Sequence, residues 1–191
     1  MDSKIKRIAI TGSAGFIGSN LIPALQKDGH KLYLVDTKNA LPIDIFEDLM
    51  HEVINWADIV IHLAALTNVN ESFENPKDVF RTNVLGTARI VELCMKYKKK
   101  LIFPSSAAIF HRELSPYAES KALAEEIVKG VIGSIPVVIL RLYNVFGPNM
   151  NPDSGSIMYN FLTSKELVVF GDGEQTRDFI HVKDVVGACL L

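Results

Sequence analysis

The sequence predicts an α/β protein built on a doubly wound parallel sheet. Strand-like and helix-like segments alternate through most of the 191 residues. The strand-like segments are apolar throughout rather than at every second position, which is typical of parallel sheets covered by helices on both faces. A glycine-rich stretch at residues 11–18 joins the first strand to the first helix. These observations predict a Rossmann fold, whose core a content of 48% hydrophobic residues can fill.

The order of the elements follows from the apolar segments and the residues that separate them. Gly29 follows the first helix and Pro76 stands in the first turn of a later one, which are usual positions for these residues. Predicted strands cover residues 5–11, 31–36, 58–65, 101–106 and 137–142. Predicted helices cover residues 16–28, 45–56, 76–97 and 116–131, and another begins near Val182.

Charge and cysteine content exclude several kinds of partner. The formal net charge of −2, from 20 basic and 22 acidic residues, favours no nucleic acid, and the lysine cluster at residues 96–100 stands at a predicted helix end. Cys94 and Cys189 lie in apolar helical patterns and are predicted to be reduced core residues. The five histidines show no metal-ligand spacing, so no metal is expected. Because no signal peptide or apolar run near ~18 residues is found, we expect a soluble, cytoplasmic protein without a membrane partner.

The stretch at residues 11–18 has the strand–turn–helix context of a phosphate-binding loop. Gly12 permits a tight turn, Gly15 leaves room for a pyrophosphate, and Gly18 allows the helix to pack closely. Free backbone N–H groups at the helix start would face the anion. The spacing is G-x-x-G-x-x-G, and the alternative interpretation is a glycine-rich turn that binds nothing.

Two aspartates follow the second predicted strand. Asp36 ends the strand, where a carboxylate can accept hydrogen bonds from both hydroxyls of an adenosine ribose and repel a 2′-phosphate. This favours NAD over NADP, although Lys38 is close by, and an ordinary turn aspartate is the alternative. Asp44 precedes a predicted helix, so it either accepts a hydrogen bond from the adenine amino group or caps the helix.

Tyr117 and Lys121 are four residues apart on a predicted helix and therefore share a face. Such a pair arises easily by chance, but here it follows a strand that ends in a hydroxyl residue, Ser106. A phenol titrates near ~10, and an adjacent ammonium together with a nicotinamide cation would favour the phenolate. The serine would donate a hydrogen bond to the substrate oxygen. The alternative is an incidental surface pair.

Several stretches, taken in order, resemble the extended short-chain dehydrogenase/reductase family. Within it the chain is most similar to the NAD-dependent nucleotide-sugar epimerase/dehydratase group, the UDP-glucose 4-epimerases above all. The stretches that carry the resemblance are residues 11–18, 62–65, 82–87, 104–110, 117–121, 141–148 and 171–184.

The resemblance implies roles for individual residues. Ser106, Tyr117 and Lys121 would form the catalytic group, with Asn83 supporting the active-site helix. The residues implied to hold NAD are Gly12, Gly15, Phe16, Ile17, Gly18, Asp36, Asp44, Ile45, Leu63, Ala64, Ala65, Asn83, Tyr117, Lys121 and Tyr143. Those implied to meet a UDP-sugar are Thr67, Ser106, Tyr117, Asn144 and Arg177, with Arg177 on the diphosphate. The family also implies a homodimer formed through the helices at residues 76–97 and 116–131.

The residues after Ser106 separate the reactions of the group. Similar dehydratases carry an Asp-Glu pair there, and related UDP-glucuronate decarboxylases usually keep a glutamate, whereas this chain has Ala107 and Ala108. We therefore expect NAD-dependent epimerisation at C4 of a UDP-sugar through a transient 4-keto intermediate. The alternatives are an NAD(P)H-dependent reductase of a keto sugar or similar carbonyl, and a catalytically idle NAD-binding module.

The expected organisation is a dinucleotide-binding domain at residues 1–147 and a partial substrate-binding subdomain at residues 148–191. Members of the group continue beyond the helix in which this sequence ends, so we expect a shortened chain or a naturally small relative. Dinucleotide binding is expected to survive in either case. Which sugar is used is left open, because the residues that discriminate it lie largely in that further part.

Overall fold

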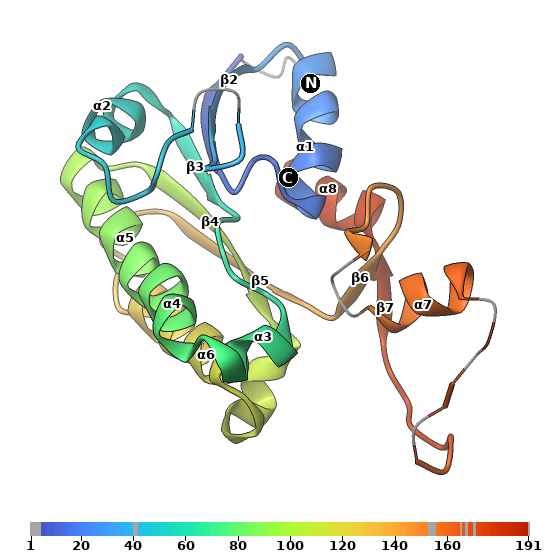
Figure 1. The fold of residues 1–191 in the computed structure, drawn as a ribbon. Helices are drawn as coiled ribbons and strands as arrows, with labels where there is room; N and C mark the ends of the chain where they lie inside the picture. Colours follow the sequence, from blue (N-terminus) through green and yellow to red (C-terminus); the bar gives the residue numbers. More distant parts are fainter. Residues whose placement is uncertain are drawn as a thin grey trace.

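The computed structural model describes residues 5–39, 42–152, 156–164, 166, 168–169 and 171–190. The outer limits of the two predicted domains, residues 1 and 191, fall outside these ranges. Five parallel strands form one sheet in the order β2-β1-β3-β4-β5 (Figure 1). They are β1 (Arg7–Thr11), β2 (Lys31–Val35), β3 (Ile59–His62), β4 (Lys100–Ser106) and β5 (Val137–Leu142). The predicted doubly wound parallel sheet is confirmed.

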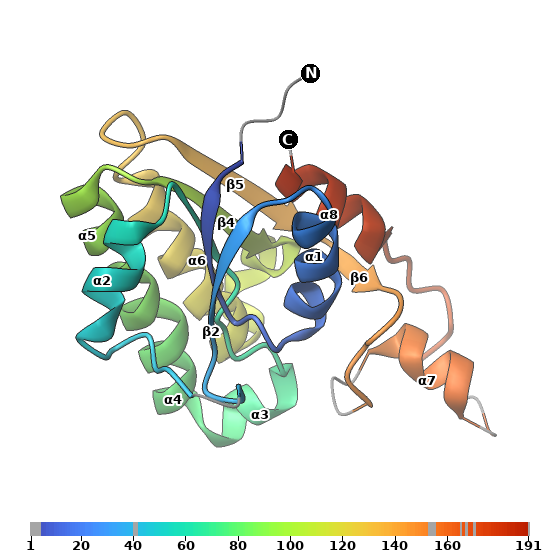
Figure 2. The same ribbon diagram turned by 90° about the horizontal axis from the view of Figure 1, so that it is seen from above.

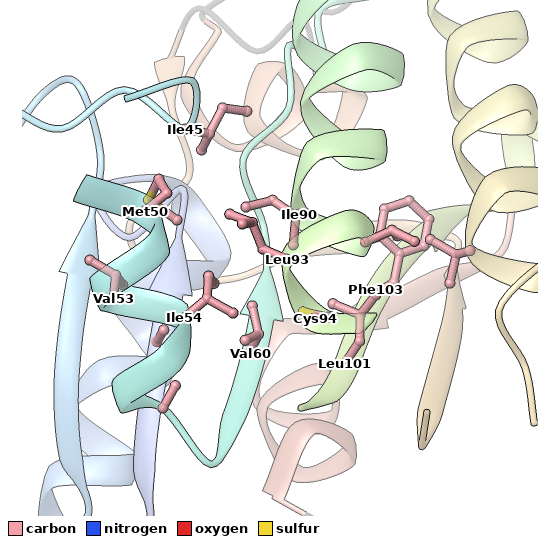
Figure 3. Packing of buried hydrophobic residues seen from close by; sticks show 14 of the residues in the cluster. Ile45, Met50, Val53, Ile54, Val60, Ile90, Leu93, Cys94, Leu101 and Phe103 are labelled. Carbon is pink, nitrogen blue, oxygen red and sulfur yellow. The ribbon is translucent and has the colours of Figure 1, made fainter. Parts of the chain in front are cut away.

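Helices cover both faces of this sheet because its apolar side chains alternate between two cores. Figure 2 shows α1 (Phe16–Lys27) and α8 (Val182–Leu190) on one face, and α2 (Leu49–Trp56), α5 (Gly86–Tyr97) and α6 (Pro116–Lys129) on the other. The strand residues facing α1 and α8 include Ile8, Ile10, Ile61 and Ile102. Those on the opposite face include Ala9, Val60, Leu101 and Phe103, which pack with Met50, Ile54, Ile90 and Leu93 (Figure 3).

Both cysteines are buried and free, one in each core: Cys94 lies on the inner side of α5 and Cys189 on the inner side of α8. The lysine cluster begins in the last turn of α5 and runs to the first residue of β4, as its charge pattern predicts. No helix in the described part of the chain combines the length and apolarity needed to cross a membrane.

The strand order places a crevice at one edge of the sheet. The chain winds in opposite directions on either side of the boundary between β1 and β3, where Thr11 is the register partner of His62. From this point the chain after β1 leads to α1 on one face of the sheet, and the chain after β3 leads to α5 on the other face (Figure 2). Ligands of such sheets bind outside the carboxyl ends of the strands at this point. The glycine-rich loop and the segment after β3 therefore meet at the crevice.

Most predicted elements are present, with two informative differences. The helix predicted at residues 76–97 consists of α4 (Pro76–Phe80), a π-helical turn, η1 (Arg81–Leu85), and α5. The helix predicted at residues 45–56 begins only at Leu49, because Asp44 and Glu47 form a separate turn in which the Glu47 amide donates to the Asp44 carbonyl at 3.0 Å.

Five short elements were not predicted from the sequence. They are α3 (Val69–Glu74), the 3₁₀ segment η2 (Ala107–Leu114), β6 (Asn144–Phe146), α7 (Ile157–Thr163) and β7 (Phe179–His181). Strands β6 and β7 form a separate two-stranded parallel sheet, with Val145 opposite Ile180. This sheet and α7 extend beyond the main body on the side where β5 ends (Figure 1).

Candidate active site

The glycine-rich loop is packed tightly against the segment that follows β3. Gly12 has φ +70, and a Cβ at this position would lie 2.5 Å from the Ala64 backbone nitrogen. A Cβ on Gly18 would lie 2.5 Å from the Ser13 carbonyl oxygen, so α1 begins directly against the loop's own backbone. These two glycines allow the close backbone packing that their spacing predicts.

Gly15 differs from both because a Cβ there would make one tight contact rather than clash with the backbone below 3.0 Å. It is the N-cap residue of α1, and a Cβ there would meet only the Gly12 carbonyl oxygen, at 3.2 Å. No side chain caps α1, and its first turn holds no acidic residue. The amides at the start of α1 are thus left to a ligand, and their dipole favours an anion. This geometry fits a pyrophosphate lying over Gly15.

Two cavities open on either side of this loop and share Gly12, Gly15, Leu63 and Ala65 in their walls. The first cavity, of about 280 Å³, adds Asp36, Asp44, Ile45 and Ala64 from the residues predicted to bind NAD. The second cavity, of about 620 Å³, adds the predicted residues Phe16, Ile17, Gly18, Thr67, Ser106, Tyr117, Lys121, Tyr143, Asn144 and Arg177. Sequence positions far apart are therefore brought to one continuous crevice.

Asp36 and Asp44 stand in the wall of the first cavity in different ways. The Asp36 carboxylate accepts hydrogen bonds from the Ala14 amide at 3.0 Å and the Lys38 amide at 2.9 Å, which fixes it beside the glycine-rich loop. The Asp44 carboxylate accepts from the Phe46 amide at 3.0 Å, while its own amide donates to the Glu47 carboxylate at 2.8 Å. This reciprocal pair caps the separate turn at residues 44–47, whereas the expected cap of the helix falls on Asp48, because α2 begins only at Leu49.

Phe46 and Arg81 also line the first cavity, and no sequence pattern predicts either of them. The Arg81 guanidinium carbon lies 4.2 Å from the centroid of the Phe46 ring. The two residues come from the turn before α2 and from the π-helical turn, so no local spacing pattern relates them. Their pairing follows from tertiary packing alone.

Ser106 and Tyr117 meet in the second cavity. A side-chain hydrogen bond joins them, and the Ser106 hydroxyl also accepts from the Ala108 amide at 3.1 Å. Burial raises the pKa of Tyr117 above its ordinary value, and the hydrogen bond to Ser106 opposes this only in part. Desolvation thus dominates in the chain without a cofactor. The expected lowering of the Tyr117 pKa depends on a nicotinamide cation as well as on Lys121, and it stays a prediction for the loaded site.

Lys121 is buried beside this pair and turned toward β4. Its ammonium donates to the Pro104 carbonyl at 2.9 Å and lies 4.5 Å from the centroid of the Phe103 ring. Burial lowers the pKa of Lys121 to about 8, against the opposing charge of Glu125. The ammonium is therefore the major form at neutral pH, but a modest rise in pH removes it.

Asn83 lies in neither cavity wall, but its side chain ties the site together. It sits in the π-helical turn and is buried. Its amide oxygen accepts from the Leu66 amide at 2.8 Å, and its nitrogen donates to the Leu66 carbonyl and to the Ser120 hydroxyl, both at 2.9 Å. The segment after β3 is thereby fixed to the turn of α6 between Tyr117 and Lys121, as support of this helix requires.

The residues predicted to meet the sugar come from outside the main sheet. Asn144 begins β6, and its side-chain nitrogen donates to the Asp178 carbonyl at 2.8 Å, which joins β6 to the chain before β7. Arg177 is exposed, and its guanidinium donates only locally in the described contacts, to the Thr176 carbonyl at 2.7 Å. Thr67 follows β3 on the opposite wall.

A parallel sheet with an anion-binding loop at its reversal point, and a Ser-Tyr-Lys group beside that loop, defines a dinucleotide-dependent enzyme of the short-chain dehydrogenase/reductase type. Residues 8–191 match the model of the NAD dependent epimerase/dehydratase family. The chain belongs to this family. The resemblance drawn from the sequence motifs and the choice of NAD as the family's cofactor are confirmed.

Individual relatives place the chain among nucleotide-sugar enzymes. It is 34% identical to a UDP-N-acetyl-alpha-D-glucosaminuronate decarboxylase of Bacillus cytotoxicus, with 97% of this chain and 70% of the relative covered. It is 35% identical to a putative UDP-glucose 4-epimerase of Methanocaldococcus jannaschii, over 96% of this chain and 72% of the relative. The chain spans only 52% of another relative, the UDP-glucuronic acid decarboxylase 1 of Xenopus tropicalis, at 30% identity.

Solved structures agree with this placement. MoeE5, determined in complex with UDP-glucose and NAD, superposes with a TM-score of 0.85 at 30% identity, covering 96% of this chain and 70% of its own. The UDP-N-acetylglucosamine 4-epimerase of Methanobrevibacter ruminantium M1, in complex with UDP-N-acetylmuramic acid, gives 0.84 at 31% identity, covering 98% and 72%. Epimerases and decarboxylases stand side by side among these relatives, so the comparisons define the family and not one reaction.

Proposed function

We propose that the chain binds NAD and a UDP-sugar and inverts the configuration at C4 of the sugar through a 4-keto intermediate. The observation that carries this proposal is the composition of the second cavity. Ser106, Tyr117 and Lys121 line it together with the glycine-rich loop, while the two positions after Ser106 are alanines. The site thus holds groups for proton and hydride transfer at a hydroxyl-bearing carbon and lacks an acid–base pair at Ala107 and Ala108.

The proposed NAD site extends from the first cavity into the second. The start of α1, which no side chain caps, would take the pyrophosphate beside Gly15, and Asp36 would accept from the adenosine ribose. Lys121, which is buried in the wall of the second cavity, would donate a hydrogen bond to the ribose next to the nicotinamide. Bound NAD would supply the hydride acceptor for C4 of the sugar and the donor from which that carbon regains a hydride.

Within this arrangement Tyr117 is the proton acceptor for the sugar 4-hydroxyl. Ser106 shares a hydrogen bond with Tyr117 and so can hold the same substrate oxygen within reach. A raised Tyr117 pKa keeps the phenol protonated in the free chain at neutral pH. The positive charges of the bound cofactor and of Lys121 are then needed to favour the phenolate, which couples proton removal to the loaded site.

The substrate side would be formed by Thr67, Asn144 and Arg177, with the Arg177 guanidinium on the diphosphate. We assign residues 148–191 to a substrate-binding subdomain on this basis. We further propose a homodimer formed through the segment from α4 to α5 and through α6, as the family resemblance implies.

Elimination is disfavoured by the same residues. Ala107 and Ala108 open the 3₁₀ segment directly after Ser106, and neither can give or take a proton. A dehydration needs an acid and a base across two carbons, so these alanines leave it without its groups. Because some relatives are decarboxylases that act on UDP-uronic acids, such a sugar is the competing substrate that tests this proposal.

The deciding experiment offers the NAD-loaded chain UDP-glucose, UDP-N-acetylglucosamine and UDP-glucuronic acid in parallel and follows the products by proton NMR. We expect the 4-epimer of a neutral sugar, with no net consumption of NAD. Release of carbon dioxide from UDP-glucuronic acid would show that the chain catalyses decarboxylation rather than epimerisation. Stoichiometric use of NADH with a keto sugar would identify a reductase, and NAD binding without turnover of any sugar would identify a binding module.

A further inference from the structure

Glu125 is a buried carboxylate that the proposed reaction does not use. It lies on α6 one helical turn after Lys121 and is 1% exposed. Its oxygens accept from the Ser105 hydroxyl at 2.6 Å and from the Arg141 guanidinium at 2.6–3.1 Å, and Lys129 approaches to 2.6 Å. A buried ion is costly and rarely improves stability over an apolar residue of similar size, so its presence points to a role beyond packing.

The contacts of Glu125 hold two neighbouring strand ends. Ser105 and Arg141 are register partners on β4 and β5, and both donate to the same carboxylate. The next residue after Ser105 is Ser106, and β5 leads within three residues of Arg141 to Asn144. The strand ends that lead to Ser106 and to Asn144 are therefore both anchored to α6 at Glu125.

The surroundings of Lys121 give Glu125 a second effect. Tyr117 and Glu125 lie one turn before and one turn after it on α6, and β4 contributes the Pro104 carbonyl and the Phe103 ring. From β3, His62 is the nearby titratable group; burial lowers its pKa to about 3, so it is neutral at physiological pH. The negative charge acting on Lys121 is that of Glu125.

We propose that Glu125 is a positioning residue that keeps Lys121 protonated and fixes the ends of β4 and β5 around the second cavity. Its hydrogen bonds to Ser105 and Arg141 set the geometry, and its charge one helical turn from Lys121 offsets the desolvation of the ammonium. The catalytic importance of Lys121 rests on the proposed function, whereas the electrostatic coupling between Glu125 and Lys121 does not.

The test is an NMR titration of Lys121 in the free chain, read from the ε-carbon of labelled lysine and assigned with Lys121→Met. Glu125→Gln keeps the size of the side chain and one acceptor oxygen, and it removes the charge together with the second acceptor. We expect it to move the Lys121 midpoint by about one pH unit to lower pH. Glu126→Gln is the matched control, because Glu126 is the exposed neighbour that pairs with Arg112 at 2.8 Å, and it should leave the midpoint in place.

If Glu125→Gln fails to fold, Arg141→Gln decides the question. Arg141 is partly exposed, and its replacement leaves the carboxylate with less opposing charge, so the Lys121 midpoint should move to higher pH. An unmoved midpoint in the folded variant overturns the proposal. NAD affinity measured by calorimetry over the same pH range should fall at the shifted midpoint in each variant. Failure of the wild-type chain to bind NAD would contradict the proposed function. The Lys121 titration would still test the coupling between Glu125 and Lys121, because it needs no cofactor.

Discussion

The first cavity is formed by loops and backbone amides, whereas the second is formed by side chains that project from helices and strands. In the first, Asp36 is held by two main-chain amides and Asp44 caps its own turn. In the second, Lys121 is buried in the wall and donates to β4, and Glu125 is buried one helical turn further along α6, where it accepts from β5. The shape of the first cavity therefore depends on the conformation of the chain, whereas the chemistry of the second depends on buried charges.

This difference determines what a substitution can do. Backbone amides keep their positions as long as the loop keeps its conformation, so changes in the first cavity act through space and shape. Buried ionisable groups depend on one another's charge, so changes in the second cavity act through protonation. The two kinds of effect are separable by experiment, and the following variants are ordered from the largest expected effect to the smallest.

Tyr117→Phe removes the proton acceptor from the second cavity and nothing from the first. General acid–base groups contribute about 10²–10⁴-fold to a rate, so we expect turnover of the UDP-sugar to fall by at least about 100-fold. NAD affinity should change by no more than about threefold, because the aromatic ring still fills its place. Steady-state rates and calorimetry on the same preparation measure both, and a variant with full turnover would remove Tyr117 from the proposed mechanism.

Gly12→Ala and Gly15→Ala divide the functions of the glycine-rich loop. An alanine at Gly12 meets three backbone atoms of residues 63–64 at 2.5–2.8 Å with φ +70, so we expect a loss of about 3 kcal/mol or more in the free energy of unfolding. Gly15 has φ −75, and its added Cβ would meet only the Gly12 carbonyl oxygen, at 3.2 Å, so its alanine should lose much less stability than Gly12→Ala and weaken NAD binding at least about tenfold.

Gly29→Ala is the matched control for backbone strain. Gly29 has φ +78 with nothing near its added Cβ, and this variant should lose only about 1 kcal/mol and keep its NAD affinity. Denaturant unfolding and calorimetry separate the three glycines. Equal losses of stability at Gly12 and Gly29 would show that the close approach to Ala64 does not matter.

The same contrast explains what the sequence could predict. The glycine-rich loop, the strands around it and the Tyr117–Lys121 pair are local patterns, and each is found where its spacing places it. The sequence predicts a helix over residues 45–56, but the Asp44–Glu47 pair closes a separate turn before α2 begins. Local hydrogen bonding at that turn outweighs apolar spacing.

Long-range features could not be predicted in this way. The π-helical turn interrupts a segment whose spacing is helical throughout, and it accompanies the contacts of Asn83 with Leu66 and Ser120. The pairing of Ser105 with Arg141 on one carboxylate depends on the strand register, which apolar runs do not specify. These contacts join residues that are distant in sequence, and they support the parts of the site that the local motifs mark.

Acid titration tests the charge of the second cavity. Burial alone would raise the pKa of Glu125, but hydrogen bonds from Arg141, Lys129 and Ser105 outweigh it and hold the pKa at about 2, below the ordinary 4.5. Stability from this group is complete above pH 4.5 and is lost as the pH falls toward 2. The loss is on the order of 3 kcal/mol. Glu125→Gln should flatten this part of the pH–stability profile measured by urea unfolding, and an unchanged slope would assign the acid sensitivity to other carboxylates.

Asp36→Asn is expected to produce a small change in cofactor binding at the first cavity. The amide still accepts from one main-chain donor, but it removes the negative charge that would repel a 2′-phosphate, with Lys38 and Arg81 in the same wall. We expect NAD affinity to fall by about fivefold and the preference for NAD over NADP to shrink by about tenfold, or about 1.4 kcal/mol. Both constants come from calorimetry.

Asp44→Asn in the same wall separates a ligand contact from a cap. Its carboxylate is already committed to the Phe46 amide, and asparagine caps equally well, so NAD affinity should stay within about twofold of wild type. If Asp44→Asn weakens NAD as much as Asp36→Asn does, the capping interpretation of Asp44 is wrong and both carboxylates contact the nucleotide. If neither variant changes the ratio of NAD to NADP affinity, cofactor choice lies with the cationic wall residues instead.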